Sequence, residues 1–125
     1  MDFHIGTPSQ YSKSKMVAEK SPETIPKGSY FLTMKDGSEI AGSLIAKRYN
    51  DSFVIRLVEV RGDYRGMGFG TKIMKEMLDH LKPKKLPVIL YVDPSNKPAL
   101  AIYTKLGFKL SKKGSAFGDK YVLSE

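Results

Sequence analysis

Residues 53–81 of this 125-residue chain read FVIRLVEVRGDYRGMGFGTKIMKEMLDHL, and this stretch decides the fold. Its first eight residues are rich in β-branched side chains and follow a turn-prone Tyr-Asn-Asp sequence, which predicts a strand over 53–60. From Phe69 onward apolar residues recur every four positions, and this period predicts an amphipathic helix over 69–81. The strand therefore passes into the helix through the seven residues RGMGFGT, 65–71.

This junction is rich in glycine, with Gly66, Gly68 and Gly70 at alternate positions. Glycine lacks the Cβ atom that would keep a ligand away from the backbone. The first turn of a helix also carries amide groups without intrahelical acceptors, at the positive end of the helix dipole. Such amides, here those of 67–71, favour a phosphate group, and Arg65 adds a permanent cation. A tight turn that binds nothing remains the alternative.

Two familiar phosphate-binding patterns do not match the junction. The phosphate loop of nucleotide hydrolases has Gly-Lys followed by Ser or Thr, whereas here Gly70 is followed by Thr71 and then Lys72. A dinucleotide fingerprint has a third glycine three positions after the second, where this chain has Thr71. A nucleotide hydrolase and a dinucleotide-dependent enzyme are therefore disfavoured.

The pattern that matches is Arg-x-x-Gly-x-Gly, formed by Arg65, Gly68 and Gly70. A second block, NKPALAIYTKLGF at 96–108, has the form Asn-x-x-Ala-x-x-x-Tyr-x-x-x-Gly-Phe. With both blocks in this order, the chain resembles the GNAT superfamily of acetyl-coenzyme A dependent N-acetyltransferases. The two blocks and the strand before them cover about residues 53–110, a little under half of the chain.

The order of predicted elements gives an α+β plan with a mixed central sheet, in one domain over residues 1–125. Strands are expected at 3–5, 30–34, 40–46, 53–60, 88–92, 108–111 and 121–123, and helices at 9–20, 69–81 and 96–106. An Asp36-Gly37 pair predicts the hairpin turn between the second and third strands. The resemblance implies the same fold, but the family has two helices between its first and second strands. This chain has only about twenty residues there. We therefore expect an open acceptor site.

The resemblance also assigns the residues that hold acetyl-coenzyme A, the implied cosubstrate. It implies a pyrophosphate cradle from Arg65, Gly66, Met67, Gly68, Phe69, Gly70 and Thr71. It places the pantetheine arm on backbone amides of a strand that bulges away from its neighbour, here Leu57, Val58, Glu59 and Val60. Asn96 either hydrogen-bonds the pantetheine, caps the following helix, or does both.

Two side chains are candidates for proton transfer. Tyr103 matches the motif tyrosine, and a phenol can give its proton to the leaving thiolate; the alternative is an aromatic ring that fills the core. Glu59 ends an otherwise apolar strand face, where a desolvated carboxylate could take a proton from the amine, and the alternative is an exposed strand-end carboxylate. No group of His, Asp and Glu has metal-ligand spacing, so no metal is expected.

Composition bounds the class of protein. The chain has no cysteine, which excludes disulfides and thiolate chemistry, and its N-terminus lacks a signal sequence, so a cytoplasmic location is expected. No apolar run is long enough to cross a membrane. The net charge of +8 is uneven: residues 1–60 carry eight basic and seven acidic side chains, and 61–125 carry thirteen and six. This excess can steer the phosphates of coenzyme A.

Three functions are compatible with these observations. The first is an N-acetyltransferase, monomeric or homodimeric, acting on a protein or peptide amine, an aminoacyl end of RNA, or a small amine. The second is a coenzyme A-binding regulatory module without catalysis, which the short N-terminal half favours and Tyr103 opposes. The third is a nucleic-acid-binding domain, which the basic charge allows but no recognition motif supports.

Overall fold

The structure is a computed structural model that describes residues 1–7 and 25–124. Its elements are β1 (Asp2–Gly6), β2 (Tyr30–Asp36), β3 (Glu39–Arg48), β4 (Phe53–Val60), a 3-10 turn (Gly62–Tyr64), α3 (Phe69–Leu81), a second 3-10 turn (Lys82–Lys84), β5 (Val88–Val92), α4 (Lys97–Lys105), β6 (Lys109–Ser115) and β7 (Gly118–Leu123). The expected helix at 9–20 lies outside the described residues.

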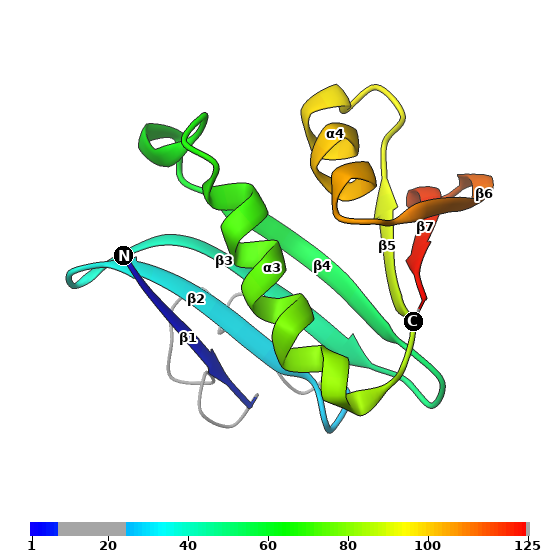
Figure 1. The fold of residues 1–125 in the computed structure, drawn as a ribbon, viewed down its shortest axis with the longest axis horizontal. Helices are drawn as coiled ribbons and strands as arrows, with labels where there is room; N and C mark the ends of the chain where they lie inside the picture. The colour runs from blue at the N-terminus through cyan, green and yellow to red at the C-terminus, as the bar shows by residue number, and fades with distance from the viewer. Residues whose placement is uncertain (8–24, 125) are drawn as a thin grey trace.

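The strands form one seven-stranded sheet in the order β1-β2-β3-β4-β5-β7-β6. Neighbouring strands are antiparallel except for the central pair β4 and β5, which is parallel. Figure 1 shows α3 lying across β1 to β4 and α4 beside β5, with both helices on the same face of the sheet. The predicted α+β fold with a mixed central sheet is confirmed.

The core lies between this sheet face and the two helices. Alternate residues of β4 and β5 turn toward the helices, as the period of a strand requires, and α3 contributes one apolar stripe at helical spacing. The buried residues of this layer include Phe53, Ile55, Ile73, Met74, Met77, Leu81, Val88, Leu90 and Val92. The amphipathic pattern of the sequence therefore correctly predicts which side of α3 faces the sheet.

The boundaries of α3 match those predicted from the sequence. Gly68 is the N-cap and adopts φ +80°, a left-handed conformation that glycine reaches without the strain of a β-carbon. At the other end a short 3-10 turn containing Pro83 follows Leu81, and the chain then reverses at Lys85 with φ +56°. Proline tolerates the first turn of a helix but cannot continue one, which explains the stop.

Two hairpins differ in detail from the prediction. Asp36 pairs with Glu39, so the turn is made by Gly37 and Ser38, one position later than expected. The last hairpin is longer than predicted, because β6 runs to Ser115 and β7 begins at Gly118. A β-carbon on Gly118 would lie 2.7 Å from the backbone of Val92, so only glycine allows this close approach.

None of the helices in residues 1–7 and 25–124 combines the length and the apolar character that a bilayer span requires.

Candidate active site

The centre of the sheet opens between β4 and β5. The two strands pair only at their first residues, Phe53 with Val88 and Val54 with Ile89. Beyond these two pairs no residue of β4 is paired with β5 in the described part of the chain. Figure 1 shows the strands separating toward the end of the sheet that carries the start of α3. The edge of β4 that faces this gap is therefore left without a strand partner and can hydrogen-bond an extended ligand.

A β-bulge shapes the same part of β4. The register of β3 against β4 shifts between Ser43 and Ile45, so residues 57–58 of β4 face the single residue Leu44. A bulge bends its strand and increases the local twist, and bulges often lie beside active sites. The backbone positions that the sequence assigned to the pantetheine arm, 57–60, comprise this bulge and the end of the strand.

A cavity of about 320 Å³ lies in the gap between the two strands. Its lining comes from three sources: β4, β5 with the turn that follows it, and α4 together with the last hairpin. The lining residues are Ile55, Arg56, Val58, Leu90, Tyr91, Val92, Asp93, Asn96, Tyr103 and Phe117. The volume is within the range of small-ligand sites. The structure thus brings the predicted residues Val58, Asn96 and Tyr103 together around one cavity.

Tyr103 occupies the apolar side of this cavity. Its side chain is half-buried, its ring packs edge-on against Phe108 at 6.1 Å between centroids, and burial raises the pKa of its phenol above the usual 10. A phenol with a raised pKa keeps its proton at neutral pH and can donate it. The two interpretations of Tyr103, core aromatic and proton donor, are therefore compatible, since the residue packs in the core and also lines the cavity.

Asn96 caps α4 at the rim of the cavity. Its Oδ1 atom accepts a hydrogen bond from the amide of Ala99 at 3.3 Å, so the capping role is confirmed. The side-chain NH2 group donates to no group of the described residues. It is available to a ligand in the cavity while the cap stays in place.

The glycine-rich loop has the geometry of an anion cradle. Gly66 and Gly68 both have positive φ, 79° and 80°, and open space surrounds the position of each missing β-carbon. Among the described residues, none accepts a hydrogen bond from the amides of 66–71. No acidic side chain lies in the first turn of α3. The positive end of the helix dipole is therefore uncompensated by the protein, which favours a bound anion.

Gly70 has a different reason to be glycine. A β-carbon there would lie 3.3 Å from Cδ1 of Ile102 on α4. The third glycine of the loop therefore lets the two helices approach each other, a packing role that the sequence analysis did not include. The loop therefore packs directly against α4, the helix that carries Tyr103.

Arg65 connects the loop to the end of β4. Its Nε atom donates a hydrogen bond to the carbonyl of Val60 at 2.9 Å, and the side chain is exposed. One donor of the guanidinium fixes the loop to the strand, and the others remain free for an anion. The predicted cation at the edge of the loop is thus present and held in position.

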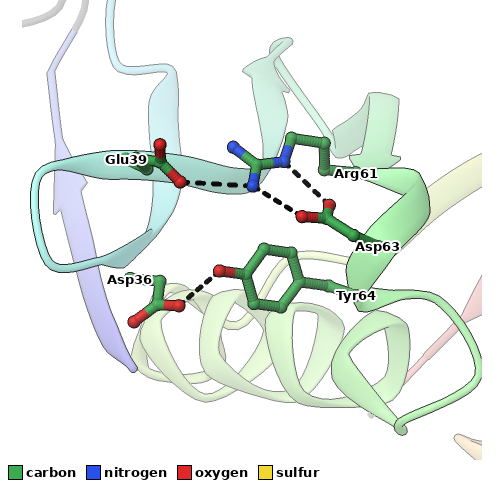
Figure 2. Close-up of polar contacts among 5 residues, drawn as sticks. All are labelled: Asp36, Glu39, Arg61, Asp63 and Tyr64. Carbon is green, nitrogen blue, oxygen red and sulfur yellow. Dashed lines mark hydrogen bonds and ion pairs between the residues drawn. The ribbon is translucent and has the colours of Figure 1, made fainter.

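A polar cluster that the sequence did not indicate holds the segment before the loop. Figure 2 shows Arg61 between Glu39 and Asp63, and Tyr64 reaching across to Asp36. The Arg61 guanidinium makes two hydrogen bonds to Asp63, at 2.7 and 2.8 Å, and one to Glu39 at 3.2 Å. The hydrogen bond to Arg61 lowers the pKa of Asp63, and the hydrogen bond to Asp36 raises the pKa of Tyr64.

This cluster positions the start of α3 and contributes little to the stability of the fold. Its charged members are exposed, and exposed ion pairs contribute little to the free energy of unfolding. The Tyr64 ring also packs edge-on against Phe69, the first residue of α3, at 6.0 Å between centroids. The tip of the β2–β3 hairpin therefore fixes where α3 begins, and with it the orientation of the loop amides.

Glu59 is exposed, which contradicts the desolvated carboxylate and agrees with the alternative, an exposed strand-end carboxylate. The bulge explains the difference, because beyond it Glu59 pairs with Ser43 and no longer continues the apolar face of Phe53 and Ile55. Three other predicted residues lie around the loop: Val60 and Thr71 are half-buried, and Met67 is exposed. Any role for Glu59 in removing a proton from an amine must act from the solvent side.

Comparison with known proteins identifies the family to which this chain belongs. Residues 3–108 match the model of the Acetyltransferase (GNAT) family, and the chain belongs to this family.

Individual relatives support this assignment. The mycothiol acetyltransferase of Thermobifida fusca is 31% identical over 110 residues, which are 80% of this chain and 34% of that protein. The chain therefore spans about a third of the length of this curated relative. The PaiA N-acetyltransferase of Thermoplasma acidophilum, solved in complex with coenzyme A, has a TM-score of 0.76 at 17% identity over all of both chains. A GNAT family acetyltransferase of Elizabethkingia anophelis, solved with acetyl-CoA bound, has a TM-score of 0.73 at 14% identity, over 99% and 97% of the two chains.

Proposed function

We propose that this chain transfers an acetyl group from acetyl-coenzyme A to a primary amine. The family match supports the reaction class, and structural neighbours contain coenzyme A or acetyl-coenzyme A. The observation that carries the proposal is the arrangement of one cavity: the unpaired edge of β4, the amide of Asn96 and the phenol of Tyr103 all border it. We also infer that residues 1–125 act as one domain, because a single sheet runs through the described residues.

The residues present fit an acyl-coenzyme A on chemical grounds. The amides of 66–71 and the guanidinium of Arg65 can bind a diphosphate. The free edge of β4 offers the hydrogen-bonding groups that an amide-containing chain such as pantetheine needs. Acetyl-coenzyme A supplies an acetyl group activated as a thioester.

Each proton in the reaction has a proposed donor or acceptor. The amine nitrogen forms the new bond to the acetyl carbon as the carbon–sulfur bond breaks, and the Tyr103 hydroxyl gives its proton to the sulfur. Backbone amides of the bulged part of β4 are the proposed donors to the carbonyl oxygen as negative charge develops there. The amine must first lose a proton, and Glu59 is the candidate acceptor, acting through water because it is exposed.

The acceptor that we favour is a small molecule. Curated relatives 31% and 36% identical to this chain are named mycothiol acetyltransferases, which supports a small-molecule acceptor, and the cavity is of small-ligand size. A protein amine and an aminoacyl end of RNA, both compatible with the sequence, are the alternatives. No recognition motif for RNA supports the latter.

Calorimetry and a transfer assay test the proposal together. We expect heat of binding with coenzyme A, and labelled product when radiolabelled acetyl-coenzyme A is incubated with a panel of primary amines. Binding without a labelled product from any small amine, protein or RNA would support the coenzyme A-binding module instead. Absence of binding by a folded sample would refute both.

The Glu59→Gln variant tests the proposed base. We expect kcat/KM at neutral pH to fall about tenfold, less than the roughly 10²- to 10⁴-fold usual for general-base catalysis, because the group is exposed. The difference from the original chain should vanish at high pH, where the amine is already neutral. Glu76→Gln, on the exposed side of α3, is the matched control. A constant ratio between variant and original across the pH range would remove Glu59 from the mechanism.

A further inference from the structure

A row of positive charge crosses the face of the sheet opposite the two helices. Lys120 on β7 pairs with both Tyr91 on β5 and Lys112 on β6, so these three side chains share one face. Arg56 lies two residues after Val54 of the last parallel pair, just as Tyr91 lies two residues after Ile89, so Arg56 is on the same face. We call Arg56, Lys112 and Lys120 the basic row.

Aromatic rings connect this row to the cavity that contains Tyr103. The Arg56 guanidinium lies 5.0 Å from the centre of the Phe117 ring, and that ring is 5.9 Å from the ring of Tyr91. Arg56, Tyr91 and Phe117 all line the cavity. Phe117 is 62% exposed, so its ring is open to a ligand.

The protein does not neutralise this charge within its described residues. Arg56 is half-buried, yet it has no carboxylate partner there; the ion pairs in the described part of the chain are those of Arg61. Lys112 and Lys120 stand directly opposite each other, an arrangement of like charges that destabilises a sheet. The carboxylate that lines the cavity, Asp93, accepts hydrogen bonds from the amide and the hydroxyl of Ser95.

A half-buried guanidinium with free donors is a strong site for an oxyanion, because charged hydrogen bonds are strongest where water is partly excluded. The same cavity is bordered on its other side by the phenol of Tyr103. An amine that entered from the face of the basic row would therefore meet the positive charge first and the proposed reaction centre behind it.

We propose that the acetyl acceptor is a small amine that also bears an anionic group, a carboxylate or a phosphate, which Arg56 binds beside the ring of Phe117 while Lys120 adds positive charge on the same face of the sheet. This inference rests on the proposed acetyl transfer and names the class of its acceptor. The anionic group fixes one end of the acceptor on the basic row, so the amine is directed into the gap between β4 and β5.

Matched pairs of amines test the proposal, each pair differing only in the anionic group. β-Alanine is compared with β-alaninamide, and glucosamine 6-phosphate with glucosamine. We expect kcat/KM for the charged member of at least one pair to exceed that of the neutral member by about ten- to a hundredfold, mainly through KM. The pair with the larger ratio identifies carboxylate or phosphate as the recognised group.

Variants at Arg56 assign the preference to this residue. Arg56→Gln should bring the ratio between charged and neutral members close to one, and Arg56→Lys should retain part of it. Arg48→Gln is the matched control: it also removes an arginine stacked on a ring, that of Phe53, but outside the cavity. For Arg48→Gln, the ratio of kcat/KM between the charged and the neutral amine should equal that of the original chain. Coenzyme A binding by calorimetry confirms that each variant is folded.

The outcomes separate this inference from the function on which it rests. Acetylation of amines without preference for the charged member, or with a preference that Arg56→Gln leaves unchanged, overturns the anionic acceptor and keeps the acetyltransferase. Coenzyme A binding with no acetylated amine in either pair overturns the small anionic acceptor, and it overturns the acetyltransferase as well if protein and RNA also remain unlabelled. Labelling of RNA or protein alone likewise overturns a small anionic acceptor.

Discussion

Replacing Tyr103 with phenylalanine is expected to lower kcat about a hundredfold while the affinity for coenzyme A stays within about threefold. The ring remains, so the packing against Phe108 and the rest of the core is kept. The hydroxyl is lost, and a general acid contributes roughly 10²- to 10⁴-fold to the rate of the step it assists. A fall in kcat without a change in cofactor binding is typical of a group that acts only in the transition state.

The pH dependence gives a second signature of Tyr103. The phenol is active in its protonated form, and burial raises its pKa above 10. Loss of this proton should therefore lower kcat only at a pH above the ordinary pKa of tyrosine. That alkaline decrease should be absent from the variant. Tyr49→Phe, which removes an exposed hydroxyl in the turn before β4, is the control. A Tyr103→Phe enzyme with the kcat of the original chain would remove the phenol from the mechanism.

The second large effect is expected from Thr71→Glu, the third residue of α3. A carboxylate in the first turn of a helix interacts favourably with the helix dipole, by about 0.3–1 kcal/mol. The melting temperature should therefore stay the same or rise slightly. The same carboxylate would stand among the free amides of the loop and repel a diphosphate, so we expect the affinity for coenzyme A to fall about a hundredfold or more.

The neutral variant Thr71→Gln separates charge from size. It has nearly the shape of glutamate, and its affinity for coenzyme A should stay within about fivefold of the original chain. Calorimetry at two salt concentrations, combined with thermal unfolding, provides the measurement. Because salt screens an electrostatic repulsion, the deficit of Thr71→Glu should shrink as salt rises. Equal affinities for the Glu and Gln variants would mean that the diphosphate does not bind at this end of α3.

Local patterns predicted the elements that position the site. The boundaries of β4 and α3 follow from the change of period at the glycine-rich junction, and α4 follows from its cap Asn96 and its stop at Gly107. These signals are local because caps, turns and amphipathic periods depend on residues within one or two turns of each other. The type and the approximate bounds of these elements could therefore be predicted from the sequence.

What the sequence could not predict depends on pairs of residues far apart in the chain. The contact between Tyr64 and Asp36 joins positions 28 residues apart, and the stacking of Arg56 on Phe117 joins two separate hairpins. The face on which Glu59 lies depends on the bulge opposite Leu44, which no residue pattern within β4 reveals. Register and separation of strands are set by the whole sheet, so such features appear only in the structure.

The two pairs of residues that join β4 to β5 have a mechanical consequence. Among the described residues they are the only strand pairing between one half, β1 to β4 with α3, and the other half, β5 to β7 with α4. Apart from these pairs, the halves meet through side-chain packing such as that between Gly70 and Ile102. A molecule hydrogen-bonded along the opening would take the place of the missing strand pairing, so we expect a bound ligand to restrict motion between the two halves.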